Sequence, residues 1–501
     1  MIGRCGTLRS VAREEGSIQQ YASVCRPRDS GVGGVSMILR ARPSPLLALC
    51  LLLLAMLLSC FPARQVARAG GGLYGDLSGI RLLAETGDTT LDQAQRYALA
   101  AIARNYGGDW HAASLTAYSF PWVRDSYAWG MITSRRDPSL AAYSGSEIRY
   151  WLAHQQRYGG WLTRQLSGHF DETPIFIAAV LDAYRVSGDL SLVRRALPQL
   201  ERGWSWMAHS YIRPARGSSA LIYALVPPYV AADWADQIAR SGYATGLEAL
   251  WYHATTSLAT MEALSGRPTK AHTFGRFAVR IKRDINRLLW AESAPYVSNA
   301  PKVAPFGHYV GWRGPRRYFE LDSNFLCILY GIADRRQSES IVAFVERHGG
   351  YLFGLDGGTG IPARVLYGDY AAADYAYRRG KIGKGLYQSA YWPSVGGLVA
   401  LALTRIGHLD EARVVLARIA EGIVVGGDIR EWYGKDGQGQ GAQYFQWGAR
   451  MYLVALCAAF GHPGPGATPP AAHLAARLFP AVAGWRWPRS VGGIDARTYP
   501  A

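Results

Sequence analysis

The spacing of the helical segments along the chain is the sequence feature that most limits its possible folds. Apolar residues recur at helical spacing in twelve segments. The segments span about 90–106, 124–135, 146–156, 174–187, 190–212, 244–265, 268–291, 322–333, 337–348, 392–407, 409–424 and 441–460. Short links follow the even-numbered segments, whereas the links that precede them are long and several exceed 25 residues.

This alternation predicts an all-α fold, an (α/α)6 barrel of six helical hairpins with elaborated loops at one end. Antiparallel neighbours reverse direction at each link, so all long links emerge at the same end. Loops of this length are usually functional or disordered, and their content of Trp, Tyr, Asp and Arg disfavours disorder. The even-numbered segments are entered from these loops and are the more apolar set, so we expect them to form the inner ring.

Local signals predict where some helices begin and end. Thr90 and Gln93 have the spacing of a capping box at the start of the first helix. Thr173–Pro174 combines a capping residue with a first-turn proline for the fourth helix. Gly188 is expected to end that helix, and Asp189 to cap the next one.

The first 69 residues have the pattern of an export leader. A short basic start, Met37–Arg42, precedes the apolar run Leu46–Leu58, which is too short to span a bilayer comfortably. Leu57–Cys60 then resembles a bacterial lipobox, which predicts acylation of Cys60. Ordinary cleavage after Ala67–Ala69 and an uncleaved anchor are the alternatives. We expect an exported bacterial protein of the cell envelope, anchored to the membrane if Cys60 is acylated.

The predicted domain organisation follows from this leader and the helical pattern. Residues 1–69 form the leader, 70–88 a tether, 89–465 the barrel, and 466–501 a C-terminal extension. With 49% hydrophobic residues, the chain is long enough to bury a large core.

Charge and cysteine content exclude several functions. The net charge is +17, of which +11 lies beyond the first 70 residues, but Lys and Arg are scattered in ones and twos. We therefore expect no nucleic-acid partner, only a basic surface with weak attraction to anionic envelope polymers. Cys327 and Cys457 lie in apolar helical patterns and are expected to be buried. No cysteine or histidine spacing indicates a metal site, and no cofactor is predicted.

The stretch Asp428–Ala449 contains a lone carboxylate, Glu431, beside Trp432 and Tyr433. A carboxylate among aromatic rings tends to have a shifted pKa or a shielded position. Aromatic rings are also common platforms for sugars, because their faces are apolar. An ordinary surface loop that leads into a core helix fits the same residues.

Polar and aromatic residues also precede four other even-numbered helices. They are Trp122, Arg124 and Asp125 before the second, Asp171 and Glu172 before the fourth, Asp233, Trp234 and Asp236 before the sixth, and Trp392 before the tenth. An arginine–aspartate turn can present donors and acceptors to sugar hydroxyls. Carboxylates that flank a tryptophan suit an acid with a raised pKa. Helix capping, an ion pair or a solvated turn would explain each of these groups equally well.

Five of these stretches together resemble a known family. PWVRDS, FDETPIFIAAVLDAYRVSGD, ADWADQIARSG, GLYQSAYWPSVGGL and IREWYGKDGQGQGAQYFQWGA occur in the order found in six-hairpin glycoside hydrolases. The sequence most resembles the glucosidase domain of glycogen debranching enzymes. Glucoamylases and processing α-glucosidases share parts of the pattern. The resemblance covers about 110–460.

The resemblance implies hydrolysis of an α-glucosidic bond with inversion. It places the general acid on Asp236 and the general base on Glu431, and it implies that Arg124 and Asp125 hold the terminal glucose. The chain departs from debranching enzymes in lacking their extra N-terminal domain. It also has Asp171-Glu172 where those enzymes have Asp-Ala.

The residues around the two carboxyls favour the same roles. Trp234 could desolvate Asp236 and keep it protonated, with Asp233 as the reserve acid. Arg430 and the polar loop after Tyr433 would favour an ionised Glu431.

We therefore expect an exo-acting inverting glycosidase that acts on a carbohydrate substrate. A phosphorylase, a non-catalytic carbohydrate-binding lipoprotein, and a lyase or uronyl hydrolase on the same barrel are the alternatives.

If Cys60 carries the lipid, Cys60→Ala should move the protein from the membrane fraction to the soluble exported fraction, because the acyl anchor is lost. Cell fractionation followed by immunoblotting measures this. A wild-type protein that is soluble and begins at Gly70 would contradict the lipoprotein hypothesis.

Overall fold

The computed structural model describes residues 77–106, 111–114, 116–118, 121–127, 138–157, 159–161, 170–212, 219–224, 233–235, 238, 240–294, 305–313, 318–347, 370, 374, 390–434 and 438–460. The leader with Cys60, residues 70–76 of the tether and the C-terminal extension therefore lie outside the described residues. Within the described ranges, no helix combines the length and apolarity needed to cross a bilayer.

Helices dominate the described part of the chain. They are α2 (Thr89–Arg104), α3 (Val123–Tyr127), α4 (Pro138–Ala153), α5 (Glu172–Ser187), α6 (Leu190–Tyr211), α7 (Thr245–Leu264), α8 (Pro268–Leu289), α9 (Leu321–Leu329), α10 (Arg335–Arg347), α13 (Pro393–Ile406), α14 (Leu409–Gly426) and α15 (Gln446–Phe460). Two short strand pairs accompany them, β1 (Trp290–Ala294) with β2 (Phe306–Tyr309), and β3 (Trp432–Tyr433) with β4 (Gly439–Gln440).

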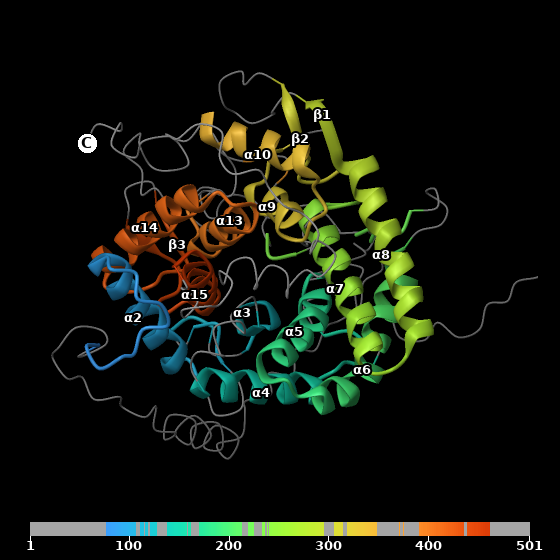
Figure 1. The fold of residues 1–501 in the computed structure, drawn as a ribbon, viewed down its shortest axis with the longest axis horizontal. Helices are drawn as coiled ribbons and strands as arrows, with labels where there is room; N and C mark the ends of the chain where they lie inside the picture. Colours follow the sequence, from blue (N-terminus) through green and yellow to red (C-terminus); the bar gives the residue numbers. More distant parts are fainter. Residues whose placement is uncertain are drawn as a thin grey trace, which may run out of the picture. The chain divides into compact units, whose positions relative to one another are not determined.

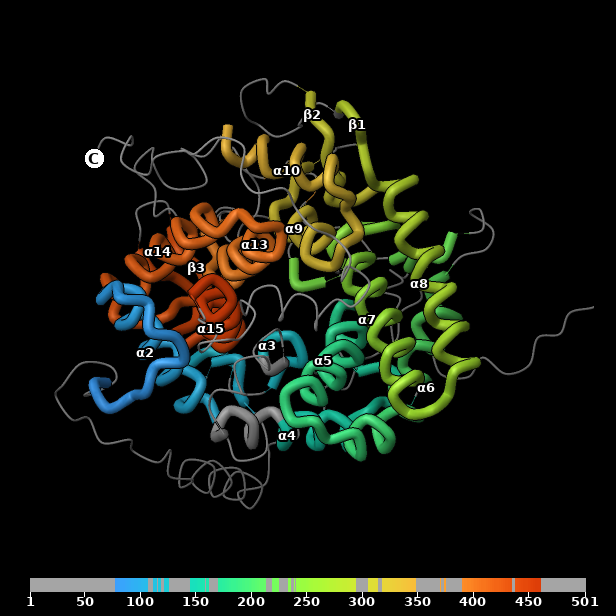
Figure 2. Tube along the Cα trace, viewed as in Figure 1, coloured from blue at the N-terminus to red at the C-terminus, as the bar shows by residue number. Residues whose placement is uncertain are grey.

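Alternate helices form the inner ring of an (α/α)6 barrel. Contacts run from α3 to α5, α7, α9, α13 and α15, and then back from α15 to α3. Figure 1 shows these helices around the centre, with α2, α4, α6, α8, α10 and α14 outside them. The colour gradient of Figure 2 shows that the ring closes where the last helix meets the first ones. The predicted fold and the predicted inner set are both confirmed.

Composition explains which helices lie inside. Every residue of α13 except Arg405, and every residue of α15 except Phe460, is buried. A helix that is apolar on all sides gains most from a position surrounded by other helices. The outer helices α6 and α8 instead bury one face and expose charged residues on the other. Cys327 and Cys457 are buried free thiols within α9 and α15, as expected.

Glycine permits the closest contact between inner helices. Gly397 of α13 faces the backbone of Met451 on α15, and a Cβ at Gly397 would lie 2.7 Å from the Met451 carbonyl carbon. Packing this close brings two buried helices together along their backbones. The α13–α15 contact therefore tolerates no side chain at position 397.

Two of the predicted helix starts are wrong in detail. Asp88, not Thr90, caps α2, because its carboxylate accepts hydrogen bonds from the backbone N–H groups of Thr90 and Leu91. Helix α5 begins at Glu172, and the Thr173 hydroxyl instead accepts a bond from the Trp161 N–H. The first start is set by a different local cap, and at the second the expected capping hydroxyl is bonded to a residue twelve positions earlier.

The end of α5 and the start of α6 agree with the prediction. Gly188 is left-handed, with φ 74°, and the Asp189 side chain accepts a hydrogen bond from Leu192 N. Helix α15 begins at Gln446 rather than near 441, because Tyr444 has φ 54° and breaks the helical path. Helix α4 begins at Pro138, earlier than predicted.

Gly397→Ala should destabilise the fold by about 1–3 kcal/mol, because overpacking forces two buried backbones apart. Gly275→Ala is the matched control, since a Cβ at that helical position meets nothing within 4 Å. The control should stabilise α8 by about 0.4–1 kcal/mol. Urea unfolding of the two variants measures both effects. Equal stability of the two variants would contradict the close α13–α15 packing.

Candidate active site

The candidate residues gather at one end of the inner ring. Trp122 directly precedes α3, Asp171 directly precedes α5, Trp392 directly precedes α13, and Glu431 lies in the segment that leads into α15. Inner helices run parallel to one another, so their N-terminal ends share one face of the barrel (Figure 1). Helix N-termini carry partial positive charge and stabilise nearby carboxylates.

Glu431 is held in place by backbone and by one tyrosine. Its N–H donates to the Ala442 carbonyl at 2.9 Å, and its Oε2 accepts from the Ala442 N–H at 3.0 Å. The Tyr118 hydroxyl lies 3.2 Å from Oε1 and 3.3 Å from Oε2. The side chain is 4% exposed. This carboxylate is therefore fixed and nearly dehydrated, unlike a carboxylate in an ordinary surface loop.

The chain around Glu431 is bent to receive its carboxylate. Gly441 has φ +66°, and a Cβ there would lie 2.5 Å from Glu431 Oε2. Tyr444 is the one described non-glycine residue with positive φ. Its N–H donates to both carboxylate oxygens of Asp428 at 3.2 Å. Asp428 thus stabilises an uncommon backbone conformation beside the site.

Arg430, which was expected to favour an ionised Glu431, also lies beside a second carboxylate, that of Asp428. Arg430 Nε lies 3.5 Å from Asp428 Oδ2, and the Gln443 amide oxygen is placed to accept from the Arg430 guanidinium. Trp432 lies in β3, half-buried, directly after Glu431. β3 pairs with β4 in a hairpin that also bonds to Tyr391 ahead of α13.

Arg124 and Asp171 form a two-bond ion pair between the neighbouring helices α3 and α5. Arg124 Nε donates to Asp171 Oδ2 at 2.9 Å, and Nη2 donates to Oδ1 at 3.2 Å. Burial alone would lower the pKa of Arg124, but Asp171, Glu172 and Asp125 raise it above its usual value. Trp122 is half-buried, with its ring centre 5.8 Å from the Arg124 guanidinium carbon. Both Arg124 and Asp125 lie in α3 itself and not in a turn.

Asp125 is a buried acid beside the other charges. Burial raises the pKa of Asp125 to about 7, with the charges of Glu431 and Asp171 adding to the effect and those of Arg124 and Arg450 opposing it. The charge of Glu431 thus reaches Asp125 from the neighbouring inner helix end. Asp125 therefore exchanges its proton in the neutral pH range, where a sugar hydroxyl could either donate to it or accept from it.

Trp234 contacts residues from four of the inner-ring helices or the positions directly before them. Its backbone N–H donates to Asp171 at 3.2 Å, and its indole N–H donates to Asp322 at 2.9 Å. The indole packs edge-to-face against Trp392 and Trp447, with ring centres 5.2 Å apart in each pair. Since these partners belong to α5, α9, α13 and α15 or directly precede them, the segment 233–235 has a fixed place against the inner ring.

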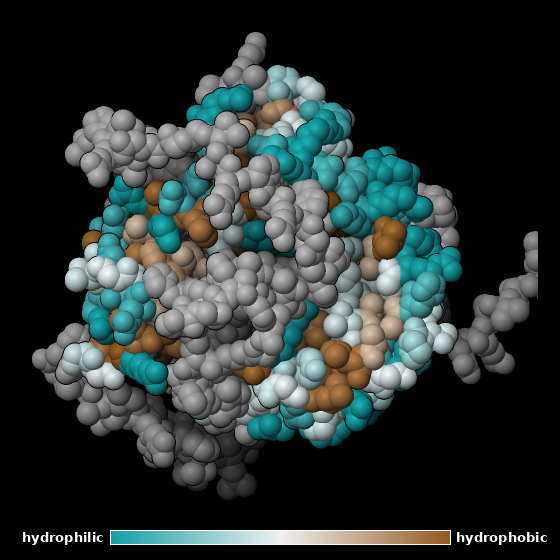
Figure 3. All heavy atoms as spheres, viewed as in Figure 1, coloured by the Kyte–Doolittle hydropathy of each residue, from teal (hydrophilic) through white to brown (hydrophobic). Residues whose placement is uncertain are grey.

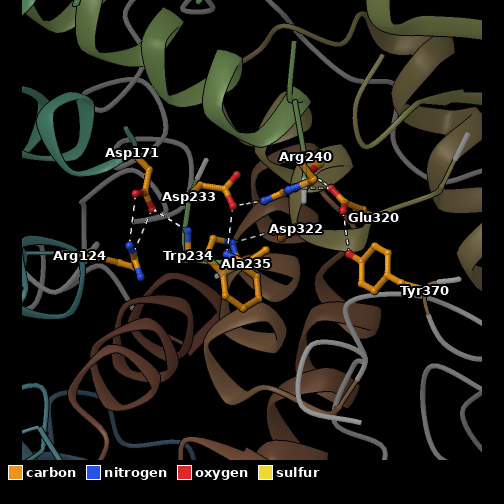
Figure 4. Close-up of polar contacts among 10 residues, drawn as sticks. Arg124, Asp171, Asp233, Trp234, Ala235, Arg240, Glu320, Asp322 and Tyr370 are labelled. Carbon is orange, nitrogen blue, oxygen red and sulfur yellow. Dashed lines mark hydrogen bonds and ion pairs between the residues drawn. The ribbon is translucent and has the colours of Figure 1, made fainter. Parts of the chain in front are cut away.

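Asp233 belongs to a buried polar chain, shown in Figure 4. Arg240 bridges Asp233 and Glu320, with Nη1 at 2.8 Å from Glu320 Oε2. Tyr370 donates to Glu320 Oε1 at 2.7 Å. An ion pair with a buried guanidinium favours the ionised form of Asp233. This environment favours Asp233 as a structural anion and disfavours it as the reserve acid.

Asp236, the predicted general acid, lies outside the described residues. Ala235, which precedes it, is buried and donates its N–H to Asp233 Oδ1 at 3.0 Å. The structure thus defines the anchor of the acid's segment and brings the other predicted residues to one end of the barrel.

Sequence reasoning missed several residues of the site. They are Tyr118, Arg450, Glu320, Tyr370 and Asp428. Glu320 and Asp322 flank the start of α9 just as other carboxylates flank inner helices, and that position was the available signal. Tyr118 and Tyr370 gave none, because tyrosines are frequent in all the long loops.

A cluster of three side chains that could hold a metal ion lies elsewhere in the described residues. Ligand atoms of Glu346, His408 and Glu411 lie within 4.8 Å of one another. His408 belongs to the turn between α13 and α14, at the opposite end of the barrel from Glu431. This cluster has no part in the candidate active site.

Comparison with known proteins supports a glycosidase on this fold. A family model described as the mannosylglycerate hydrolase MGH1-like glycoside hydrolase domain matches residues 220–448. No curated protein matches the chain. A mannosylglycerate hydrolase of Thermus thermophilus, solved with Tris and D-glycerate, is similar with 15% identity and a TM-score of 0.51. The match covers 72% of this chain and 99% of that one.

Two other solved structures share the architecture. A bacterial glucoamylase complexed with acarbose has 14% identity and a TM-score of 0.54, with 74% of this chain and 55% of that chain covered. A rhamnosidase from Klebsiella oxytoca with rhamnose bound has 13% identity and a TM-score of 0.56, with 77% and 66% covered. At these identities the likeness shows the fold.

The raised pKa of Asp125 predicts a pH-dependent stability. The folded state holds this proton up to about pH 7, whereas the unfolded chain releases it near pH 4. Stability should therefore decrease as pH rises from about 4 to 7, by up to roughly 4 kcal/mol. Asp125→Asn should lose this decrease, and urea unfolding of both proteins at pH 5 and pH 8 measures it.

Asp189→Asn is the control of opposite sign. Bonds from Ser191 and Leu192 lower the pKa of Asp189, so its contribution is present at neutral pH and is lost only as pH falls through the acidic range. Parallel profiles for wild type and Asp125→Asn between pH 5 and pH 8 would contradict the raised pKa.

Proposed function

We propose that this protein is an exo-acting glycoside hydrolase that inverts the configuration at the anomeric carbon, with Glu431 as general base and Asp236 as general acid. The observation that carries the proposal is the environment of Glu431. It is a buried carboxylate, positioned by the Ala442 N–H and Tyr118, at the end of the ring where Arg124, Asp125 and Trp234 also lie.

Glu431 suits the base because its contacts favour the ionised form. Two donors, the Ala442 N–H and the Tyr118 hydroxyl, bond its oxygens, and such bonds stabilise a carboxylate. As base, it takes one proton from a water molecule whose oxygen forms the new bond to the anomeric carbon. The old glycosidic bond breaks on the opposite face of the sugar.

Asp236 suits the acid because it follows a segment that is fixed against the ring. Trp234 and Ala235 are bonded to Asp171, Asp322 and Asp233 immediately before it. As acid, it gives its proton to the glycosidic oxygen as the leaving group departs. Inverting enzymes separate the two carboxyls by about 6.5–9.5 Å to admit the water. Trp234 provides the apolar wall that would raise the pKa of such an acid.

Arg124, Asp125 and Glu172 would bind the terminal sugar. Asp125, with a pKa of about 7, can exchange hydrogen bonds with a hydroxyl in either direction. Trp122, Trp392 and Trp432 would provide apolar contact with the ring faces of the sugar. The debranching-type motifs favour an α-glucosidic bond. The similar proteins are named for other sugars, so mannosylglycerate and rhamnosides belong in the same substrate panel.

The proposal includes export to the cell envelope. Its basis is the lipobox-like Leu57–Cys60 after a short apolar run. A lipid on Cys60 would hold the barrel at the membrane surface, where a polymer or oligosaccharide substrate could reach it.

Glu431→Gln should reduce kcat by about 10³-fold and leave sugar binding measurable, because the base is lost while the pocket keeps its shape. Asp236→Asn should impair substrates with poor leaving groups far more than glycosyl fluorides, which need less protonation. NMR of the first product anomer, over the whole substrate panel, tests inversion directly.

Asp182→Asn is the matched control, a buried aspartate of α5 that pairs with Arg185 at 2.9 Å far from the loops. It should alter stability and leave kcat/KM unchanged. Wild-type turnover by Glu431→Gln, or a product that retains its configuration, would contradict the proposed mechanism.

A further inference from the structure

Helix α8 exposes a row of four arginines, Arg276, Arg280, Arg283 and Arg287. They follow one another at intervals of four, three and four residues, which places them on one face of the helix. All four are exposed. From Arg276 to the end of α8, the only other exposed side chain is Val279, at 70%. We call these four residues the α8 arginine row.

The charge of the row is not balanced within the described residues. Asp284 is the only acidic residue of α8, and it is buried. Its Oδ2 accepts from the Ala220 N–H, while Oδ1 lies 3.2 Å from Arg283 and 3.3 Å from Arg287. One carboxylate thus serves two arginines. Arg276 and Arg280 form no ion pair with a described acidic residue.

On two other outer helices, an exposed arginine forms an ion pair with an acidic residue of the same helix. On α10, Arg335 pairs with Glu339 at 2.7 Å, and on α14, Arg418 pairs with Glu421 at 2.9 Å. These intrahelical pairs neutralise the surface locally. In the α8 row only Arg283 and Arg287 have such a partner, and they share the single carboxylate of Asp284, so positive charge is concentrated on one outer wall. In Figure 3, hydrophilic residues gather at the right of the view, where Figure 1 shows α8.

The direction of α8 relates the row to the candidate active site. α8 follows α7 through a short turn and packs against it. It therefore ends at the level where α7 begins, which is the end of the barrel that carries Glu431. The row spans about 16 Å along the helix, at about 1.5 Å per residue. A linear ligand on it would run along the outer wall towards the site's rim, nearest at Arg287.

We propose that the α8 arginine row binds a linear acidic polysaccharide through its carboxylates. Guanidinium groups bind carboxylates with two parallel hydrogen bonds, and a chain of uronate sugars presents carboxylates in a row. Such binding would hold a polymer beside the active site without occupying it.

The helix disfavours other polyanions. Its apolar residues Phe274, Ile281 and Ile285 are buried in the core, so α8 has no free apolar face to insert into lipid. No aromatic side chain is exposed from Arg276 onward, so nucleic-acid bases would find no stacking platform there. The choice of a saccharide rests on the proposed glycosidase function.

The test measures binding of fluorescent polygalacturonate to the full-length protein by anisotropy, with neutral dextran as the reference polymer. Each arginine changed to glutamine should weaken binding on the order of fivefold. Arg276→Gln/Arg280→Gln is the principal variant, and the quadruple variant should lose binding. For four contacts, log K should fall with log salt concentration with a slope of about −3, by analogy with single-stranded polyanions.

Arg335→Gln/Arg418→Gln is the matched control, because it removes the same charge from exposed helices whose arginines are already paired. It should bind polygalacturonate like wild type. All variants should keep wild-type turnover of a short neutral substrate. If neither the wild type nor any variant hydrolyses a substrate of the panel, the proposed function fails. The inference about the α8 arginine row still stands in that case, provided that the row binds polygalacturonate.

Three outcomes would overturn the inference. In the first, wild type and Arg276→Gln/Arg280→Gln bind polygalacturonate with equal affinity. In the second, the control variant loses as much affinity as Arg276→Gln/Arg280→Gln does. In the third, the wild type binds RNA or phosphatidylglycerol vesicles as tightly as polygalacturonate, or more tightly.

Thermal melts verify that each variant is folded. If the quadruple variant is unfolded, the single variants Arg276→Gln and Arg280→Gln decide, since neither removes an ion pair with a described residue.

Discussion

The closure of the inner ring between α15 and α3 is the constraint on which the rest of the site depends. Residues more than 300 positions apart meet there. Tyr118 bonds Glu431, the two guanidinium nitrogens of Arg450 bond Glu147, and Gln446 donates its backbone N–H to Ala113. None of these contacts can form until the sixth hairpin lies beside the first. The carboxylate that we propose as the base is therefore positioned only in the closed ring.

The closed ring also explains how so many charges are buried at one end. A buried carboxylate is costly unless it is bonded or neutral. Asp171 has Arg124, and Asp233 and Glu320 share Arg240. Asp125 instead keeps its proton to about pH 7, because neighbouring carboxylates add to the effect of burial. Fixed anions and one titratable acid thus coexist within a few side chains of each other.

The sequence predicted the periodic part of this structure well and the non-local part poorly. Helical periodicity is local, so it located the helices and, with the long links, the ring and the end that carries Glu431. The cap of α2 at Asp88 and the start of α15 at Gln446 were missed, because the first depends on which side chain folds back over the helix end and the second on the φ of Tyr444. The contact between Arg430 and Asp428 was not predicted, since it depends on how the loop folds back. Partners such as Tyr370 became visible only in the folded chain.

The apolar bodies of the inner helices stabilise the fold, whereas the polar residues at their starts and in the preceding loops form the site. α13 and α15 are buried along almost their whole length, and the close contact at Gly397 involves only backbone and apolar atoms. The polar residues of the site lie in the first turns and the loops before them. Changes in those loops therefore alter what the ring can bind without disturbing how it packs.

This separation accounts for a barrel shared with a mannosylglycerate hydrolase, a glucoamylase and a rhamnosidase at 13–15% identity. It also means that the sugar must be identified from the loops, because the helices of the ring are common to all of them.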